Sequence, residues 1–492
     1  MEEPGPGGQP DTYPEPLGHP EPVEGAVRTW RLYMLVLGLV VGAILALQIA
    51  GIISRVAPQE SDLPDQPWSR LTAGDVMIKL ALVDLPGRRA EQSAAEAVAI
   101  YRQALPWPAA YRRIGITRIH FLGARGISDL ERIASPDATR ELDERQVARL
   151  RDEVRMWREA FVGPAITPAR ARELEPRIRK LNLGPLKEIA VAEVYERAGD
   201  KARAAALVAD AKAASMTSLG ALGFMVGIQA LAALVGVLLV ILFLVGTAST
   251  LAASPPPRIQ PSILILSFLT YILATYVLSV LAAAVAALGG LLQVGESGQV
   301  AYLTLEVLAT LGAIALAATV LRWLAAQARE DPSEIGLRPL GLVESVKWGV
   351  AGYCAVLPLM VVAIAISTVL SSTICRQIPT PEHPVLPFVA EGGLVFVVVF
   401  VLGAVIAPIV EEVTFRGMLY GALRARMSVW GAGLLSAAIF ALVHPTLPGG
   451  FLPIVALGLV FAILRERTGS LTPSMICHGV NNAIIFILVK LV

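Results

Sequence analysis

Long apolar runs without charged residues dominate this sequence and limit its fold more than any other feature. A helix of about 20 apolar residues crosses a bilayer, and residues 32–53 form one such run. Further runs lie at 218–245, 263–293, 301–325, 346–371, 389–423, 431–446, 451–464 and 471–491. Backbone polar groups must pair within lipid, so each run is expected to be a helix. The sequence predicts an all-α, polytopic transmembrane helix bundle with about nine spans.

Composition supports a membrane protein and excludes several other classes. Of the 492 residues, 55% are hydrophobic and 16% are charged, whereas soluble proteins carry about 25% charged residues. Lys and Arg number 41 against 40 Asp and Glu, so no basic excess indicates a nucleic-acid partner. The three cysteines form neither a CxxC metal motif nor a readable disulfide framework.

The polarity of the chain divides it into five parts. Residues 1–27 are rich in Pro, Gly and Glu and are expected to be a disordered tail. Residues 28–54 contain the first transmembrane helix, and the polar block 55–215 is predicted to be an inserted soluble helical domain. Additional transmembrane helices fill 216–299, and 300–492 form a last membrane domain.

Apolar residues at helical spacing indicate that the block 55–215 is helical. This spacing occurs in "EQSAAEAVAIYRQALP" and in "LKEIAVAEVYERAGDKARAAALVADAKAA". The second stretch resembles a tetratricopeptide-type hairpin, although a repeat array needs three or more units. A plain helical domain is therefore the favoured interpretation, and such a domain can bind a peptide or a partner protein. Residues 114–127, "IGITRIHFLGARGI", are the one stretch with β character, and His120 within it is expected to be structural.

The basic residues near the span ends predict the orientation of the chain. Arg and Lys flank alternate ends of the spans, at Arg28, Arg31, Arg258, Arg322, Arg329, Arg338, Lys347, Arg424, Arg426, Arg465 and Arg467. The cytoplasmic loops of membrane proteins carry an excess of Lys and Arg near the ends of their spans. The pattern predicts a multi-pass protein of the cell membrane with a cytoplasmic N-terminus. Because one span precedes it, the 55–215 domain is expected to be extracytoplasmic.

Three charges interrupt the apolar run "VLGAVIAPIVEEVTFRGMLYGALR", at Glu411, Glu412 and Arg416. Burying ions in an apolar segment is expensive, so such residues usually have a function. Residues four apart share a helix face, and this predicts an ion pair between Glu412 and Arg416. Glu411 points elsewhere and has no partner in its own helix. The alternative is an interfacial cluster that only fixes the depth of the helix.

Two later apolar spans contain histidines with partners at helical spacing. In "FALVH", Phe440 and His444 are four residues apart, and in "HGVNN" His478 and Asn482 are four apart. A carboxylate beside a neutral imidazole can hold and deprotonate a water molecule. A second imidazole and a carboxamide can donate hydrogen bonds to an oxyanion. Alternatively, Glu411, His444 and His478 are the candidate ligands of a divalent metal such as zinc. Either arrangement predicts peptide-bond hydrolysis within the membrane.

The three segments "EEVTFR", "FALVH" and "HGVNN", in this order, resemble the motifs of the CAAX protease and bacteriocin-processing (CPBP, or Abi) family of intramembrane proteases. The resemblance covers roughly residues 300–492 and says nothing about the 55–215 domain. It implies that Glu411 and His444 activate water and that His478 and Asn482 stabilise the oxyanion. It further implies that Glu412 and Arg416 support the site.

The leading functional hypothesis is therefore an intramembrane endopeptidase acting on membrane-associated proteins or peptides. One alternative is a non-proteolytic member of the same fold that acts as a scaffold or immunity protein. Another is a transporter whose intramembrane Glu and His residues carry protons or ions. Transporters of that kind often consist of two matching halves, and no internal duplication is visible in this sequence.

Overall fold

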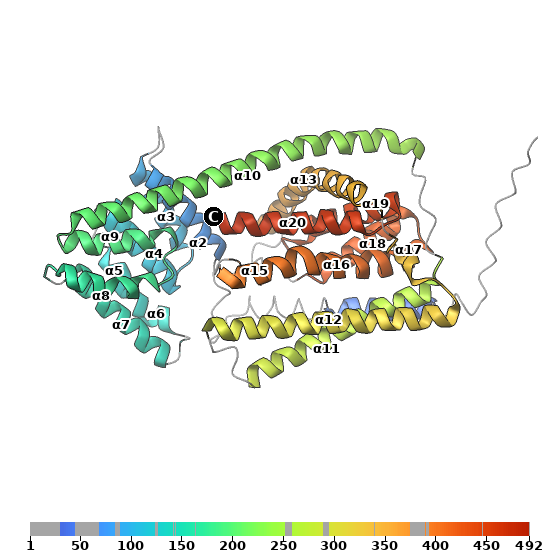
Figure 1. Cartoon of the computed structure of the whole chain (residues 1–492), viewed down its shortest axis with the longest axis horizontal. Helices are drawn as coiled ribbons and strands as arrows, with labels where there is room; N and C mark the ends of the chain where they lie inside the picture. The colour runs from blue at the N-terminus through green and yellow to red at the C-terminus, as the bar shows by residue number, and fades with distance from the viewer. Residues whose placement is uncertain are drawn as a thin grey trace, which may run out of the picture.

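The computed structural model describes residues 30–44, 68–83, 89–123, 126–140, 142, 144–162, 164–250, 258–288, 295–338, 340–373, 389, 393–444 and 446–491. The expected disordered tail, 1–27, lies outside these residues. Within them the chain forms helices and no strands. The predicted all-α, polytopic fold is confirmed, and the helices fall into a small domain and a long bundle (Figure 1).

The small domain lies at one end of the molecule in Figure 1, and because of this end position we call it the outer domain. Its helices are α2 (Trp68–Val83), α3 (Ala90–Arg102), α4 (Pro108–Phe121), α5 (Ile127–Glu131), α6 (Pro136–Thr139), α7 (Glu144–Phe161), α8 (Pro168–Arg179) and α9 (Lys187–Arg197). Their shared core includes Tyr101, Ile114 and Trp157, which are at most 2% exposed. A buried Asp75 also joins α2 to its neighbours, because it accepts hydrogen bonds from Tyr101 and Arg113.

The expected β character of residues 114–127 is wrong. Helix α4 covers residues 108–121, and it begins with Pro at its first turn, a favourable position for that residue. Side chains of α4 are buried on several faces, including Ile114 and Ile116. A helix enclosed in this way needs no apolar stripe, so its sequence lacks the periodicity that identifies a surface helix. His120 contacts Glu193 of α9 at 2.5 Å.

The bundle contains α10 (Lys201–Thr250), α11 (Pro261–Leu288), α12 (Gly295–Ala328), α13 (Leu342–Thr373), α15 (Gly393–Val401), α16 (Ala407–Glu412), α17 (Tyr420–Arg424), α18 (Val429–Leu442), α19 (Phe451–Thr468) and α20 (Thr472–Leu491). Among the described residues, six helices are long and apolar enough to cross a membrane. Two shorter apolar helices are Trp30–Ile44 and Val429–Leu442. Each of the nine expected ranges overlaps a helix.

Helix α10 is continuous from the outer domain into the bundle and spans 50 residues. It pairs with α9 in the outer domain and packs against α13 in the bundle. The approach to α13 is close, because a Cβ added at Gly236 would lie 1.8 Å from the carbonyl oxygen of Cys354. Small residues allow such contacts between membrane helices.

A second connection joins the outer domain to the end of α20 (Figure 1). Lys79 of α2 donates hydrogen bonds to the Leu491 carbonyl oxygen and to the Ser218 hydroxyl, each at 2.8 Å. The last carbonyl groups of a helix have no partner within the helix. The outer domain thus supplies a hydrogen-bond donor to a carbonyl group at the end of α20, the helix that contains His478 and Asn482.

Candidate active site

Two π-helical segments flank the short helix α16 that carries Glu411 and Glu412. They are Leu402–Ile406 before it and Val413–Leu419 after it. A π-helical turn shifts the register of the backbone hydrogen bonds, and such turns are frequent at functional sites. The first segment contacts α20, where Asn482 donates a hydrogen bond to the Gly403 carbonyl oxygen at 2.8 Å.

Glu412 and Arg416 form the ion pair that their spacing predicts. The Nη1 of Arg416 lies 3.1 Å from the Oε1 of Glu412, and neither side chain is exposed. A buried pair of this kind offsets the desolvation of both ions only in good geometry with further hydrogen bonds. Glu412 gains one of these from α20, because the Nδ1 of His478 lies 3.2 Å from the same Oε1.

His478 lies between the two adjacent glutamates. Its Nδ1 faces Glu412, and its Nε2 lies 3.7 Å from the Oε2 of Glu411. A carboxylate accepts hydrogen bonds, so Nδ1 carries a proton toward Glu412 and the ring orientation is set. The Glu411 side chain is 24% exposed whereas that of Glu412 is 0% exposed. Glu411 is therefore the more exposed of the two glutamate side chains, although its Oε2 is buried.

Aromatic rings enclose the charged groups. The ring of Phe461 stacks on His478 at 4.8 Å between centroids, with 24° between the planes. The guanidinium carbon of Arg416 lies 4.3 Å from the ring centroid of Phe440 and 5.0 Å from that of Phe461. Cation–π contacts strengthen when the cation is desolvated. These rings hold Arg416 and His478 in place without adding polar groups.

His444 joins the site through Phe440. The two rings meet edge to face at 4.6 Å, and the Nδ1 of His444 lies 2.7 Å from the Phe440 carbonyl oxygen. A carbonyl only accepts, so this Nδ1 is the protonated nitrogen. When the ring is neutral, Nε2 therefore presents a lone pair. On its other side, Phe440 lies 5.9 Å from the ring of His478.

Asn482 is positioned by the backbone of the first π-helical segment and by its neighbour Asn481, which donates to it at 3.2 Å. Within the described ranges, no hydrogen bond joins Asn482 to Glu411, His444 or His478, and none joins His444 to Glu411. The direct contacts therefore bring together Glu411, Glu412, Arg416, Phe440 and His478. His444 contacts this group through the ring and the carbonyl oxygen of Phe440. Asn482 lies one helical turn from His478 on α20.

Several buried polar atoms of the site have no hydrogen-bond partner among the described residues. They are the Oε2 atoms of Glu411 and Glu412 and the Nε and Nη2 of Arg416. Buried polar groups in folded proteins are usually hydrogen-bonded. These atoms supply both donors and acceptors, which are the groups that bind a water molecule and a peptide carbonyl.

The arrangement fits a metal ion less well than a water molecule. In the part of the chain that the structure describes, no three His, Cys, Asp or Glu side chains have the arrangement of a metal site. The guanidinium of Arg416 already provides a positive charge beside Glu412.

The sequence analysis did not identify three features of the site. These are Phe461, Gly458 and the two π-helical segments. A Cβ added at Gly458 would lie 2.9 Å from the Nη2 of Arg416, so this glycine makes room for the guanidinium. Gly458 and Phe461 are three residues apart on α19 and share a face. The spacing of glycine and phenylalanine in "LGLVFAIL" is the one feature of the sequence that could have indicated these two residues.

A known protein family matches the part of the chain that contains the candidate site. Residues 393–484 match the family described as "Type II CAAX prenyl endopeptidase Rce1-like". This range contains both glutamates, both histidines and Asn482. At the family level, the match indicates a membrane protease.

Two curated relatives are each similar over slightly fewer than 90 residues of this chain. The "Putative membrane peptidase YdiL" of Bacillus subtilis (strain 168) is 33% identical over 88 residues, which is 18% of this chain and 36% of that protein. The "UPF0177 protein YbdI" of Lactococcus lactis subsp. lactis (strain IL1403) is 33% identical over 89 residues, 18% of this chain and 48% of the relative. The chain thus spans less than half the length of either relative. No solved structure matches it.

Proposed function

From the premise that residues 393–484 belong to the CPBP family of CAAX-type membrane proteases, we propose that this chain is an intramembrane endopeptidase. It hydrolyses peptide bonds of membrane-associated proteins or peptides with a water molecule activated by Glu411 and His444. The observation that carries the proposal is the position of His478, whose two ring nitrogens face Glu411 and Glu412 within a buried site.

The proposed reaction uses Glu411 as the base. Glu411, assisted by the Nε2 of His444, takes a proton from water, and the water oxygen forms a bond to the peptide carbonyl carbon. The resulting oxyanion receives hydrogen bonds from the Nε2 of protonated His478 and from the Asn482 amide. When the tetrahedral intermediate collapses, the C–N bond breaks and Glu411 returns the proton to the departing amine.

Glu412 and Arg416 act on this chemistry by positioning. Glu412 accepts a hydrogen bond from the Nδ1 of His478, and Arg416 places its positive charge beside the same carboxylate oxygen. A fixed carboxylate behind a histidine sets the tautomer and orientation of the ring. This division of roles makes Glu411 the reactive carboxylate and Glu412 the structural one.

The proposed orientation places the N-terminus in the cytoplasm and the outer domain outside the cell. It is supported by the basic residues near alternate span ends. The substrate would then enter from the bilayer, and the outer domain is available to a protein or peptide partner. Protease protection of intact cells and of inverted vesicles tests this orientation, since added protease should digest the outer domain only in intact cells.

The test of function compares wild type with Glu411→Gln, which keeps the size of the side chain. Membrane peptides and amino-terminal fragments from cells carrying each form should differ, with the cleavage products absent from the variant. Glu306→Gln is the matched control, because Glu306 is a second carboxylate in an apolar helix and it contacts Ser279 rather than the site. Unchanged products in Glu411→Gln would remove this residue from the mechanism. Absence of cleavage by the wild type would favour a scaffold or immunity protein.

A further inference from the structure

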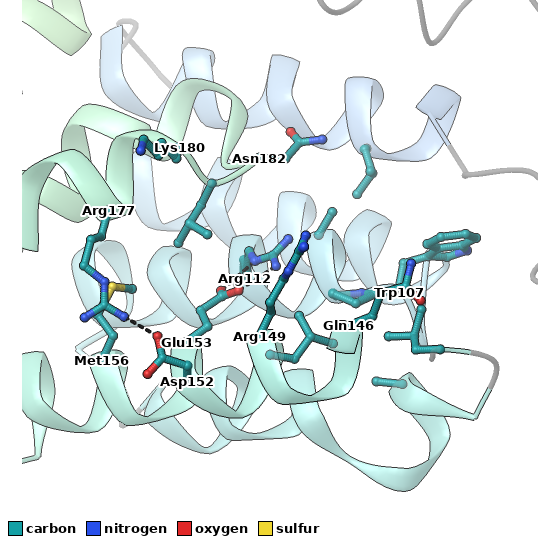
Figure 2. A pocket seen from close by; sticks show the side chains of 17 residues that line it. Trp107, Arg112, Gln146, Arg149, Asp152, Glu153, Met156, Arg177, Lys180 and Asn182 are labelled. Carbon is teal, nitrogen blue, oxygen red and sulfur yellow. Dashed lines mark hydrogen bonds and ion pairs between the residues drawn. The ribbon is translucent and has the colours of Figure 1, made fainter. Parts of the chain in front are cut away.

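The outer domain contains a cavity of about 690 Å³ that the proposed protease reaction does not use. Its walls come from α2, α4, α6, α7, α8 and the segment that follows α8 (Figure 2). Pockets that bind ligands usually have volumes of about 300–1,000 Å³. The apolar part of the wall includes Leu71, Trp107, Leu150, Met156 and Leu181. Such walls accommodate aliphatic or aromatic groups.

The acidic groups in the cavity wall already have partners. Both carboxylate oxygens of Glu153 accept hydrogen bonds from Arg112 at 2.7 Å, and Trp157 donates a third at 3.0 Å. Asp152 accepts from Arg177 at 2.6 Å, the contact drawn in Figure 2, and from Arg155 at 3.0 Å. The strong acceptors of the wall are therefore occupied by the protein itself.

Several donors in the same wall are not occupied. Arg149 and Lys180 have exposed side chains and no ion-pair partner among the described residues. Arg113 donates to the Oδ1 of Asn182 at 3.2 Å, which leaves the amide NH₂ of Asn182 to other acceptors. The indole N–H of Trp107 likewise has no partner in the described part of the domain. All four of these groups are donors, and two of them, Arg149 and Lys180, are cations.

We propose that this cavity binds an acidic peptide segment that carries apolar side chains. The two cations bind its carboxylates, the Asn182 amide and the Trp107 indole donate to its backbone carbonyl oxygens, and the apolar wall accommodates its side chains. Charge complementarity selects this occupant, because a basic or neutral segment would leave both cations without partners. The proposal does not depend on the protease reaction.

The experiment measures binding to the full-length protein in nanodiscs by fluorescence anisotropy. The probe is a labelled decapeptide that alternates Glu with Leu, and its partner peptide has Gln at every Glu position. The Glu peptide should bind at least ten times more tightly, and its affinity should fall as salt is raised, since exposed charges are screened. Equal affinity of the two peptides would overturn the proposal.

Variants then test the site itself. Arg149→Glu with Lys180→Glu should weaken binding of the Glu peptide at least tenfold and leave the thermal unfolding midpoint unchanged. Arg151→Glu is the matched control, because Arg151 is an exposed arginine on α7 that does not line the cavity. It should bind like wild type, and equal losses in the two proteins would indicate a non-specific charge effect. Free glutamate or a short fatty acid that competes at the peptide's own affinity would indicate a small-anion site and overturn the peptide assignment.

Discussion

The Nδ1 of His478 and the Nη1 of Arg416 bind the same oxygen atom of Glu412, at 3.2 Å and 3.1 Å. Glu412 thereby joins two helices whose contacting residues are 66 positions apart in sequence. All three side chains are buried. Glu412 is consequently the group that couples the stability of the bundle to the orientation of the candidate catalytic histidine.

Replacing Arg416 with Met should destabilise the protein, because the buried Glu412 would lose the cation that pairs with it. Breaking a buried ion pair from one side costs about 3–5 kcal/mol, so we expect a strongly reduced yield of folded protein after detergent extraction. The double variant Glu412→Gln/Arg416→Met should recover part of the yield but not the cleavage activity, since His478 loses its orienting carboxylate. Recovered activity in the double variant would contradict the positioning role of Glu412.

Gly458 should not tolerate a methyl group. A Cβ at this position would lie 2.9 Å from Arg416 Nη2 and 2.9 Å from the Cβ of Ala437. Overpacking of a core usually costs about 1–3 kcal/mol, and the displaced guanidinium would weaken the pair with Glu412. Gly458→Ala should therefore lower both the unfolding midpoint and the cleavage rate. The control is Gly227→Ala on α10, where nothing lies within 4 Å of the added atom; there, both quantities should stay unchanged.

Local spacing predicted the parts of this site that lie on one helix. Glu412 and Arg416 are four residues apart, and so are Phe440 and His444, and both pairs are in contact. Helical geometry alone requires such neighbours. The same rule separated Glu411 from the ion pair, although its contact with His478 required knowledge of how α16 and α20 pack.

The features that sequence reasoning missed depend on packing between helices. Phe461 lies in a helix with many apolar residues, and only its stack on His478 distinguishes it. The π-helical segments leave no periodic signal, because their identity depends on the backbone hydrogen bonds. Helix α4 was misjudged for a related reason, since burial on several faces removes the pattern that marks a helix.

Phe461 is expected to be a positioning residue for His478. Phe461→Leu keeps an apolar side chain but removes the flat surface, so we expect kcat to fall about tenfold, equivalent to about 1.4 kcal/mol of the activation free energy. KM should change little, and Phe461→Tyr should restore kcat because it restores the ring. Phe224→Leu on α10, where Phe224 is 69% exposed, is the control for loss of a phenylalanine. A rise in KM with constant kcat would instead place Phe461 in substrate binding.

Chelation distinguishes the two chemistries that the sequence left open. We expect cleavage by the purified protein to persist after dialysis against EDTA and 1,10-phenanthroline, because Glu411 and His444 activate water directly in the proposed reaction. Loss of activity that added zinc restores would assign Glu411, His444 and His478 as ligands. Metal analysis of the dialysed protein is the necessary control, since a tightly held ion can survive dialysis.

The outer domain should lose stability at alkaline pH through Tyr101. Its hydroxyl donates to Asp75 at 2.6 Å, and burial, together with the Asp75 charge, raises the pKa of Tyr101 well above its usual value of 10.0. The unfolded chain releases this proton near pH 10 whereas the folded domain retains it. The contribution of Tyr101 to the free energy of unfolding is therefore complete below about pH 10. It is lost as the pH rises toward the pKa of Tyr101 in the folded domain. Tyr101→Phe should be less stable near neutral pH and should show a flatter decline between about pH 9 and pH 11. Thermal unfolding of both proteins across this range measures the difference, and parallel declines would assign the alkaline loss to other groups.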